Sequence, residues 1–276
     1  MVTKIVLPAA GLGSRLLPIT KEIPKEMLPI FLKTSTNSLT IKPLIQILFE
    51  QFYNHNFREF CFVVGKQKRT IEDHFTSDFT FLSNPSLDDN VKKDLETFYG
   101  MLNESKIFWV NQQKPKGFGD AVLYTEPFVG KDDFIVCAGD TLLPKEGDLI
   151  QKLNEKKLVG EFDACIVLQN VPNPKRFGIA VVDQTSDDVI VTNVEEKPKK
   201  PKTNLAIVAI YHFRPSIFSA IRQIKENENE IQLTDAIQKL IEWGGKVSAI
   251  ILDEQIEVID IGTVESYLKF LKVYDL

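Results

Sequence analysis

Residues 7–29 read LPAAGLGSRLLPITKEIPKEMLP, and this stretch decides how the rest of the chain is interpreted. It overlaps the apolar run KIVLPA at residues 4–9, which predicts a buried β-strand. Gly11 and Gly13 come directly after that run, and a glycine lets backbone N–H groups approach phosphate oxygens without a side chain in the way. A strand followed by glycines therefore indicates a phosphate-binding turn.

Three prolines interrupt the stretch after the glycines: Pro18, Pro24 and Pro29. They exclude a regular helix, so we predict a stiff loop at the carboxyl end of the first strand. Arg15 offers a planar guanidinium for phosphates, and Lys21 and Lys25 add point charges. Cations on a stiff loop with bare backbone amides suit a polyphosphate.

The glycine spacing matches neither of two common phosphate-binding motifs. The dinucleotide pattern would need a third glycine at Leu16, and the segment VVGKQKRT lacks both ends of a P-loop. On spacing alone, an ordinary glycine turn remains open.

Apolar runs alternate with helical patterns over the first 160 residues. We predict strands at 4–9, 59–65, 105–112 and 133–140, and helices at 42–57, 67–75, 119–128 and 148–157. This rhythm is typical of an α/β protein with a doubly wound, mainly parallel sheet. The later part is expected to add antiparallel pairing, with strands at 163–171, 177–183, 188–196, 205–213 and 246–252 and helices at 216–224 and 234–243.

Composition excludes several classes of protein. The net charge of −5 argues against a nucleic-acid partner. No apolar stretch approaches the roughly 18 residues of a membrane span, and no signal peptide precedes the first strand. The three cysteines lie in separate apolar runs without zinc-site spacing, so we expect buried free thiols and a cytoplasmic location: Cys61, Cys137 and Cys165.

Further motifs follow the glycine loop in a fixed order. They are KPLIQ (42–46), KGFGDAV (116–122), AGDTLL (138–143), FGIAVVD (177–183), VEEKPK (194–199), TNLAIV (203–208), ENEIQLTDAI (228–237) and DIGT (260–263). Together with AGLGSRLLPITKEIPKEMLP they resemble the sugar-nucleotide pyrophosphorylases over nearly the whole chain. TKEIPKEMLP and EIQLTDAI resemble the branch of bacterial-type UTP–glucose-1-phosphate uridylyltransferases.

The resemblance implies a fold and a reaction. The fold is a Rossmann-like, glycosyltransferase-A-like nucleotidyltransferase domain over 1–276, with helices on both faces of a mixed sheet. Residues 1–160 would form its nucleotide-binding part and 161–276 its sugar-phosphate-binding part. The reaction joins UTP and glucose 1-phosphate into UDP-glucose and pyrophosphate, with Mg²⁺ as cofactor. A phosphate monoester, whose second pKa is about 6, is already a dianion at neutral pH, so the attack needs no general base.

The same resemblance assigns residues to the nucleotide. The backbone of Ala10, Gly11 and Gly13 would hold nucleobase and phosphates. Arg15 would hold the β- and γ-phosphates, and Lys25 would reach the α-phosphate. The two residues expected to read the uracil edge are Gln112, through its amide, and Gly117, through its backbone.

Metal and sugar residues follow from the later motifs. Asp140 and Asp260 would form a metal pair, although each alone is also typical of a turn or a helix cap. Lys197 would take the sugar phosphate and Glu196 the sugar hydroxyls, with Gly178 leaving room for the sugar. Because strand neighbours point to opposite faces, only one of Glu195 and Glu196 can face the site, and we expect it to be Glu196.

The strand that carries this pair should also end there. Pro198 is expected to end the strand and to hold the residue before it, Lys197, at extended backbone angles.

The chain departs from the family in three places. Ser14 stands where many relatives have Thr, and Asp120 stands where the uridylyl branch often has His. Residues 32–41 look like an insertion, which would shape the active-site mouth, form an oligomer contact or be a passive surface loop.

Alternative functions are a thymidylyltransferase or dual UTP/dTTP enzyme, a catalytically dead paralogue and a NAD-binding dehydrogenase. A dead paralogue should have lost one of four residues that are all present: Arg15, Lys25, Asp140 and Asp260. The dehydrogenase fails on the missing third glycine. We also expect a homo-oligomer, either a dimer or a tetramer, with no membrane partner.

Overall fold

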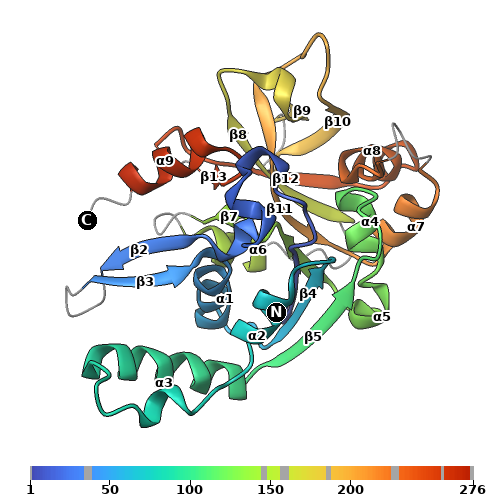
Figure 1. Ribbon diagram of the computed structural model, residues 1–276. Coiled ribbons are helices and arrows are strands. Elements are labelled where there is room, and N and C mark those ends of the chain that lie inside the picture. Colours follow the sequence, from blue (N-terminus) through green and yellow to red (C-terminus); the bar gives the residue numbers. More distant parts are fainter. Residues whose placement is uncertain are drawn as a thin grey trace.

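A single long sheet organises the molecule. The computed structural model describes residues 2–33, 39–143, 148–155, 162–184, 188–224, 230–255 and 258–273. Within these residues nine strands form one sheet in the order β5-β4-β1-β6-β11-β8-β12-β10-β9 (Figure 1). Their bounds are β1 Lys4–Pro8, β4 Glu59–Val64, β5 Lys106–Asn111, β6 Phe134–Cys137, β8 Ala164–Asn170, β9 Gly178–Asp183, β10 Ile190–Glu196, β11 Leu205–Phe213 and β12 Val247–Ile251.

The first half of this sheet is parallel and the second half is mixed. β1 pairs in parallel with both β4 and β6, so that Ile5 lies beside Phe60 on one side and Ile135 on the other. β11 runs antiparallel to β6 and β8, whereas β12 is parallel to β8. The predicted change of texture after residue 160 is therefore confirmed. One sheet runs through both parts of the chain.

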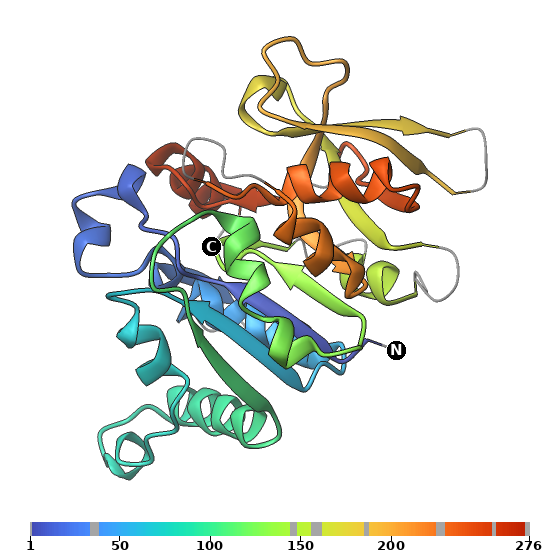
Figure 2. The same cartoon turned by 90° about the vertical axis from the view of Figure 1, so that its right-hand side faces the viewer.

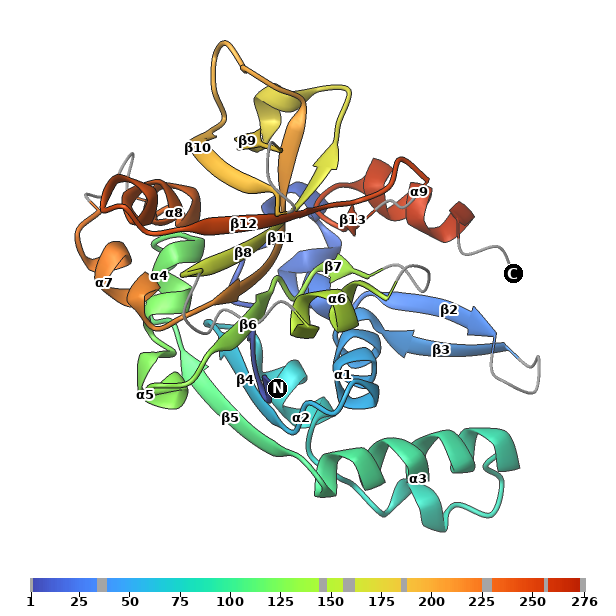
Figure 3. The same ribbon diagram turned by 180° about the vertical axis from the view of Figure 1, so that it is seen from behind.

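Helices cover both faces of the sheet, as predicted. One face packs against α1 (Leu44–Asn54), α2 (Arg69–His74), α3 (Asp89–Asn103) and α6 (Leu149–Glu155). The other face packs against α4 (Phe118–Leu123), α5 (Glu126–Val129), α7 (Ser216–Arg222) and α8 (Leu233–Glu242). Figure 3 shows the two groups from behind, with α7 and α8 at the opposite side of the sheet from α1 and α3. Alternate residues of each central strand enter the two cores, since strand side chains alternate between faces.

Several predicted boundaries were wrong. The helix expected from residue 42 begins at Leu44, because Lys42 and Pro43 belong to a strand. The helix expected over 119–128 is two short helices, α4 and α5. Two helices, α3 and α9 (Val264–Val273), were not predicted from the sequence. The apolar face of α3, formed by Phe98, Tyr99 and Leu102, packs into the core. Such tertiary packing supplies most of the stability of a helix of this kind.

The apparent insertion at 32–41 is framed by a hairpin. β2 (Pro29–Lys33) and β3 (Leu39–Pro43) pair antiparallel in a separate two-stranded sheet that projects from the body (Figures 1 and 3). Residues 34–38 of the insertion lie outside the described residues. The hydroxyl of Tyr267 on α9 donates to the carbonyl of Pro29, 2.7 Å away, so the C-terminal helix contacts the base of the hairpin.

The cysteine side chains are buried, as the sequence predicts. The three cysteines form no disulfide. Among the helices described, none combines the length and apolar character needed to cross a bilayer.

Candidate active site

The loops of four neighbouring strands meet at one edge of the sheet. The N–H of Ala9 donates to the carbonyl of Val63 (2.8 Å), and the N–H of Gly139 donates to that of Pro8 (2.9 Å). On the far side, the N–H of Gln112 donates to Val64 (2.8 Å). The chain thus leaves β5, β4, β1 and β6 side by side, at the carboxyl edge where ligands bind in open α/β sheets.

The predicted stiff loop follows β1 as three short 3₁₀ turns. They span Ser14–Leu16, Ile19–Lys21 and Lys25–Met27. Gly13 has φ of +64°, and its carbonyl accepts from the Thr20 hydroxyl at 2.8 Å. A side chain at Gly13 would meet Thr20 at 3.1 Å, so glycine is required there both by conformation and by space.

The loop returns Lys25 to the strand ends. Its ammonium forms an ion pair with the carboxylate of Asp140, the residue that follows the β6 strand and Gly139. A side chain at Gly11 would lie 3.6 Å from Lys25 Cε, which places the ammonium beside the first glycine. Burial alone would lower the pKa of Lys25, but Asp140, Glu26 and Asp260 outweigh it and raise that pKa. Lys25 therefore stays charged.

Asp260 joins this group from the other end of the chain. β7 (Thr141–Leu142) pairs with β13 (Ile259–Asp260), and the N–H of Ile261 donates to the carbonyl of Asp140 at 3.0 Å. The two carboxyl groups lie close enough to act on each other's pKa. Asp260 is partly exposed to solvent. Even so, desolvation by the surrounding protein, and after it the negative charge of Asp140, raises the pKa of Asp260. Burial acts on Asp140 too, but Lys25 outweighs it and lowers the pKa of Asp140.

Arg15 lies on the exposed side of the same group. A side chain at Gly262 would stand 3.0 Å from Asp260 Oδ2 and 3.3 Å from Arg15 Nη2, so the glycine lets the guanidinium and the carboxylate approach each other. In Figures 1 and 2 the loop after β1, in dark blue, lies beside the red segment that carries Asp260. The four charged residues that the sequence singled out are thus brought together from three segments.

This donor set fits a magnesium ion. Desolvation, and after it the charge of Asp140, raises the pKa of the neighbouring Asp260, and a divalent cation between two such carboxylates would relieve their repulsion. Mg²⁺ is held by one or two protein carboxylates together with substrate phosphates and waters. Asp140 and Asp260 supply that number, and no larger cluster of acidic, His or Cys ligands occurs among the described residues.

The buried ion pair of Glu26 and Lys68, next to Lys25, was not predicted from the sequence. Glu26 is 1% exposed and accepts a hydrogen bond from Lys68 at 2.7 Å, with Lys68 itself 6% exposed. Burial raises the pKa of Glu26, and the charges of Lys68 and Lys25 oppose that shift. Lys68 follows β4, so this pair ties the loop of β1 to the end of the neighbouring strand. Both residues look like surface charges in the sequence, because each lies in a polar run.

A hydrogen-bonded amide, that of Gln112, lies at the end of β5. The Gln112 amide nitrogen donates to Asp120 Oδ2 (2.6 Å) and to the carbonyl of Gly117 (3.2 Å). Gly117 has φ of +103°, and a side chain there would collide with the Ile231 carbonyl at 2.6 Å. Ile231 also donates to the carbonyl of Lys116 at 2.6 Å. The segment before α8 therefore packs directly on the loop that carries Gly117.

The predicted sugar residues lie at the end of β10. Glu196 Oε2 accepts from the Thr234 hydroxyl at 2.8 Å, and a side chain at Gly178 would meet both groups within 3.0 Å. Glu195 is exposed, so it is Glu196 that points to the interior side. Thr234 was not foreseen, although it lies within the motif EIQLTDAI.

Lys197 corrects one expectation. Its φ is +44°, which is left-handed and not extended, although β10 does end at Glu196 as Pro198 predicted. The N–H of Lys197 donates to the carbonyl of Phe177 (3.0 Å), and its ammonium lies 3.2 Å from Glu196 Oε1. The backbone hydrogen bond to Phe177 thus accompanies a turn at Lys197 that the residue preference before proline would disfavour.

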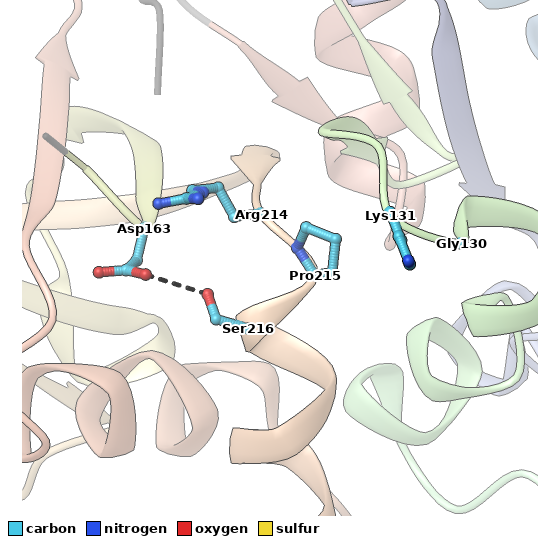
Figure 4. Close-up of a pocket in the computed structure, with 6 residues that line it drawn as sticks. All are labelled: Gly130, Lys131, Asp163, Arg214, Pro215 and Ser216. Carbon is cyan, nitrogen blue, oxygen red and sulfur yellow. Dashed lines mark hydrogen bonds between the residues drawn. The ribbon is translucent and has the colours of Figure 1, made fainter. Parts of the chain in front are cut away.

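A separate cavity of about 360 Å³ lies at the opposite edge of the sheet, before β6 and β8 (Figure 4). Ser216 donates to Asp163 there at 3.1 Å. Its cations, Lys131 and Arg214, are accompanied by acidic neighbours: Asp163 lines the cavity, and the charge of Arg214 acts on Asp133. None of the residues singled out by the sequence lines it.

Comparison with known proteins identifies the family of the chain. Residues 4–275 match the family model described as nucleotidyl transferase. The chain is 36% identical over 248 residues to the UTP–glucose-1-phosphate uridylyltransferase of Bacillus subtilis, covering 87% of this chain and 81% of the relative. It is 34% identical over 252 residues to the Pseudomonas aeruginosa enzyme of the same name, covering 88% and 86%.

Solved structures show the same likeness. A UDP-glucose pyrophosphorylase complexed with UDP-glucose superposes with a TM-score of 0.83 at 28% identity, covering 99% of this chain and 98% of the other. A UTP-bound enzyme from Acinetobacter baumannii gives 0.77 at 28% identity, covering 99% and 93%.

Proposed function

The chain belongs to the nucleotidyl transferase family, and from that premise we propose that it is a UTP–glucose-1-phosphate uridylyltransferase. It transfers a uridylyl group from UTP to glucose 1-phosphate, giving UDP-glucose and pyrophosphate. The sugar phosphate forms a new bond to the α-phosphorus, and the bond from that phosphorus to the pyrophosphate oxygen breaks. The Rossmann-like α/β sheet with helices on both faces is the fold shared with the structural relatives.

One observation carries the proposal. Arg15, Lys25, Asp140 and Asp260 meet beside the glycine loop at the carboxyl edge of β1 and β6. Two positively charged side chains beside a pair of carboxylates suit a metal-bound polyphosphate. The side-chain cations would neutralise some of the phosphate charges, and a metal ion held by the carboxylates would neutralise the rest.

The reaction then needs positioning and charge compensation. The attacking dianion requires no general base. Lys25, held charged by its carboxylate neighbours, neutralises charge at the α-phosphate. Arg15 binds the β- and γ-phosphates, which leave as pyrophosphate. The backbone of Ala10, Gly11 and Gly13 cradles the nucleotide.

Asp140 and Asp260 would hold the magnesium ion. When bound there, such an ion would supply divalent positive charge to the phosphates of the reaction. The two carboxylates are themselves held in place by the β7–β13 pairing and by Lys25, so little rearrangement is required of the protein.

The base and the sugar are proposed to bind at the two remaining groups of residues, at the ends of β5 and β10. Gln112 and the backbone of Gly117 read the uracil edge, while Glu196 accepts from sugar hydroxyls and Lys197 binds the sugar phosphate beside Gly178. In this arrangement residues 1–160 handle the nucleotide and 161–276 the sugar phosphate. Use of dTTP remains the alternative, since one methyl group is worth only about 1–3 kcal/mol in a pocket. We further propose a cytoplasmic homo-oligomer, a dimer or a tetramer.

A pyrophosphate-release assay tests the proposal. Purified protein is given UTP, dTTP, CTP, ATP or GTP, each with glucose 1-phosphate, galactose 1-phosphate or mannose 1-phosphate, with and without Mg²⁺. We expect the highest kcat/KM for UTP with glucose 1-phosphate and loss of turnover in excess chelator. A preference for dTTP would favour the alternative, and absence of pyrophosphate release with every pair would overturn the assignment.

A further inference from the structure

The buried contact between Gln112 and Asp120 has a consequence for nucleotide choice. The two side chains are 4% and 7% exposed, and polar groups buried to this extent are normally hydrogen-bonded. Gln112 leaves the end of β5 and Asp120 lies in the first turn of α4. Their contact, at 2.6 Å, joins the amide nitrogen to a carboxylate oxygen.

The neighbours of Gln112 determine which way its amide points. A glutamine amide has an acceptor oxygen and a donor nitrogen, and the two ends look alike unless their partners differ. Here the same end faces two acceptors, the Asp120 carboxylate and the Gly117 carbonyl. An oxygen in that place would be repelled by both, so the nitrogen must stand there.

Asp120 is the stronger of these two partners. Its hydrogen bond is charge-assisted and 2.6 Å long, whereas that to the neutral Gly117 carbonyl is 3.2 Å long. Removing the Asp120 charge would therefore weaken the preference for one amide orientation, although Gly117 would keep part of it.

The fixed orientation leaves one atom to read a ligand. Among the described residues, the contacts of the Gln112 amide are all made by its nitrogen, and none is made by Oε1. Gln112 thus offers an acceptor. Uracil presents an N3–H donor at its pairing edge, whereas cytosine presents an N3 acceptor there.

We propose that Asp120 is a positioning residue for nucleobase choice: it locks the Gln112 amide so that only its oxygen faces the base, which admits uracil and rejects cytosine. This inference rests on the proposed function, because it takes Gln112 as the reader of the base. It assigns a role to a residue at which the chain departs from its branch.

The test compares UTP with CTP in one assay. The measured quantity is the ratio of kcat/KM for UTP to that for CTP, each with glucose 1-phosphate and Mg²⁺. The variants are Asp120→Asn, Gln112→Leu and the double variant. Glu126→Gln is the matched control, since it makes the same carboxylate-to-amide change at a surface ion pair with Arg222. A ratio is independent of the folded fraction, so loss of stability does not change it.

We expect Asp120→Asn to lower the ratio by about tenfold or more, because an asparagine side chain can donate to a flipped amide. Glu126→Gln should leave the ratio unchanged. In the Gln112→Leu background, Asp120→Asn should have no further effect, since Asp120 acts through Gln112.

Two results would overturn the proposal. One is an unchanged UTP/CTP ratio in Asp120→Asn while the wild type prefers UTP. The other is a full effect of Asp120→Asn in the absence of the Gln112 amide, which would mean that Asp120 meets the base itself. A wild type that does not prefer UTP would instead contradict the proposed function, so the two failures are distinguishable.

Discussion

The proposed phosphate end and the proposed base end of the site are built on different principles. At β1, β6 and β13 the side chains are charged and paired with one another, as in the contact of Lys25 with Asp140. At β5 and α4 a neutral amide is held by two acceptors around Gln112. Fixed charges stabilise the negative charge that develops during the reaction, whereas an oriented amide distinguishes one nucleobase from another. Damage to the first end should lower turnover, and damage to the second should change selectivity.

The largest expected effect is at the carboxylate pair. Asp140→Ala removes the partner of Lys25 and one proposed metal ligand, so turnover should fall by about 10³-fold while the circular dichroism spectrum is retained. Asp73→Ala, an exposed aspartate on α2, is the control. Excess chelator should lower the wild-type rate to a similar extent. Wild-type turnover in chelator would exclude the metal role and remove the main contrast between the two ends.

The second effect concerns the buried pair behind the phosphate loop. Glu26→Gln leaves the Lys68 charge buried without its partner, and the free energy of unfolding should fall by about 3 kcal/mol. Denaturant unfolding measures it. Replacing both residues, as Glu26→Gln with Lys68→Met, should restore part of the loss.

The exposed pair of Lys239 and Glu242 provides the control for that measurement. Glu242→Gln should leave the unfolding midpoint unchanged, because exposed ion pairs contribute little. If Glu26→Gln were equally silent, the loop would have to be held by other contacts.

The third effect separates the two substrates. Arg15→Ala should reduce kcat/KM for UTP by about 10- to 100-fold, since a charge-assisted contact to the leaving phosphates is lost. The KM for glucose 1-phosphate should change little. Initial-rate kinetics with each substrate varied in turn provide the measurement. Unchanged nucleotide kinetics would make Arg15 a surface residue, in spite of its place beside Gly262.

The smallest effect tests the sugar end. Glu196→Gln should weaken glucose 1-phosphate use by about tenfold and reduce discrimination against galactose 1-phosphate, because one strong acceptor becomes a weaker one. Glu195→Gln, one residue earlier and exposed, is the matched control and should be nearly silent. A sensitive Glu195 with a silent Glu196 would move the sugar assignments by one strand position.

Much of the fold was predictable because local patterns and long-range contacts agree. The runs KIVLPA, EFCFVV and FIVC are apolar on both faces, which is typical of parallel strands covered by helices on both sides, and they became β1, β4 and β6. The features that were missed depend on distant neighbours. For α3, the decisive packing involves Phe98, which meets the rings of Phe49 and Phe75.

The sequence by itself determined the sheet, the glycine loop and the family, since strand periodicity, proline and glycine act over a few residues and the motifs keep their order. Only the tertiary structure decided which charges meet. Nothing within TKEIPKEMLP shows that Lys25 faces Asp140 while Glu26 turns inward to Lys68. Likewise, GFGD does not show that Asp120 orients Gln112. Such pairs join strand ends far apart in the chain, and their chemistry arises only when the sheet brings those ends to one edge.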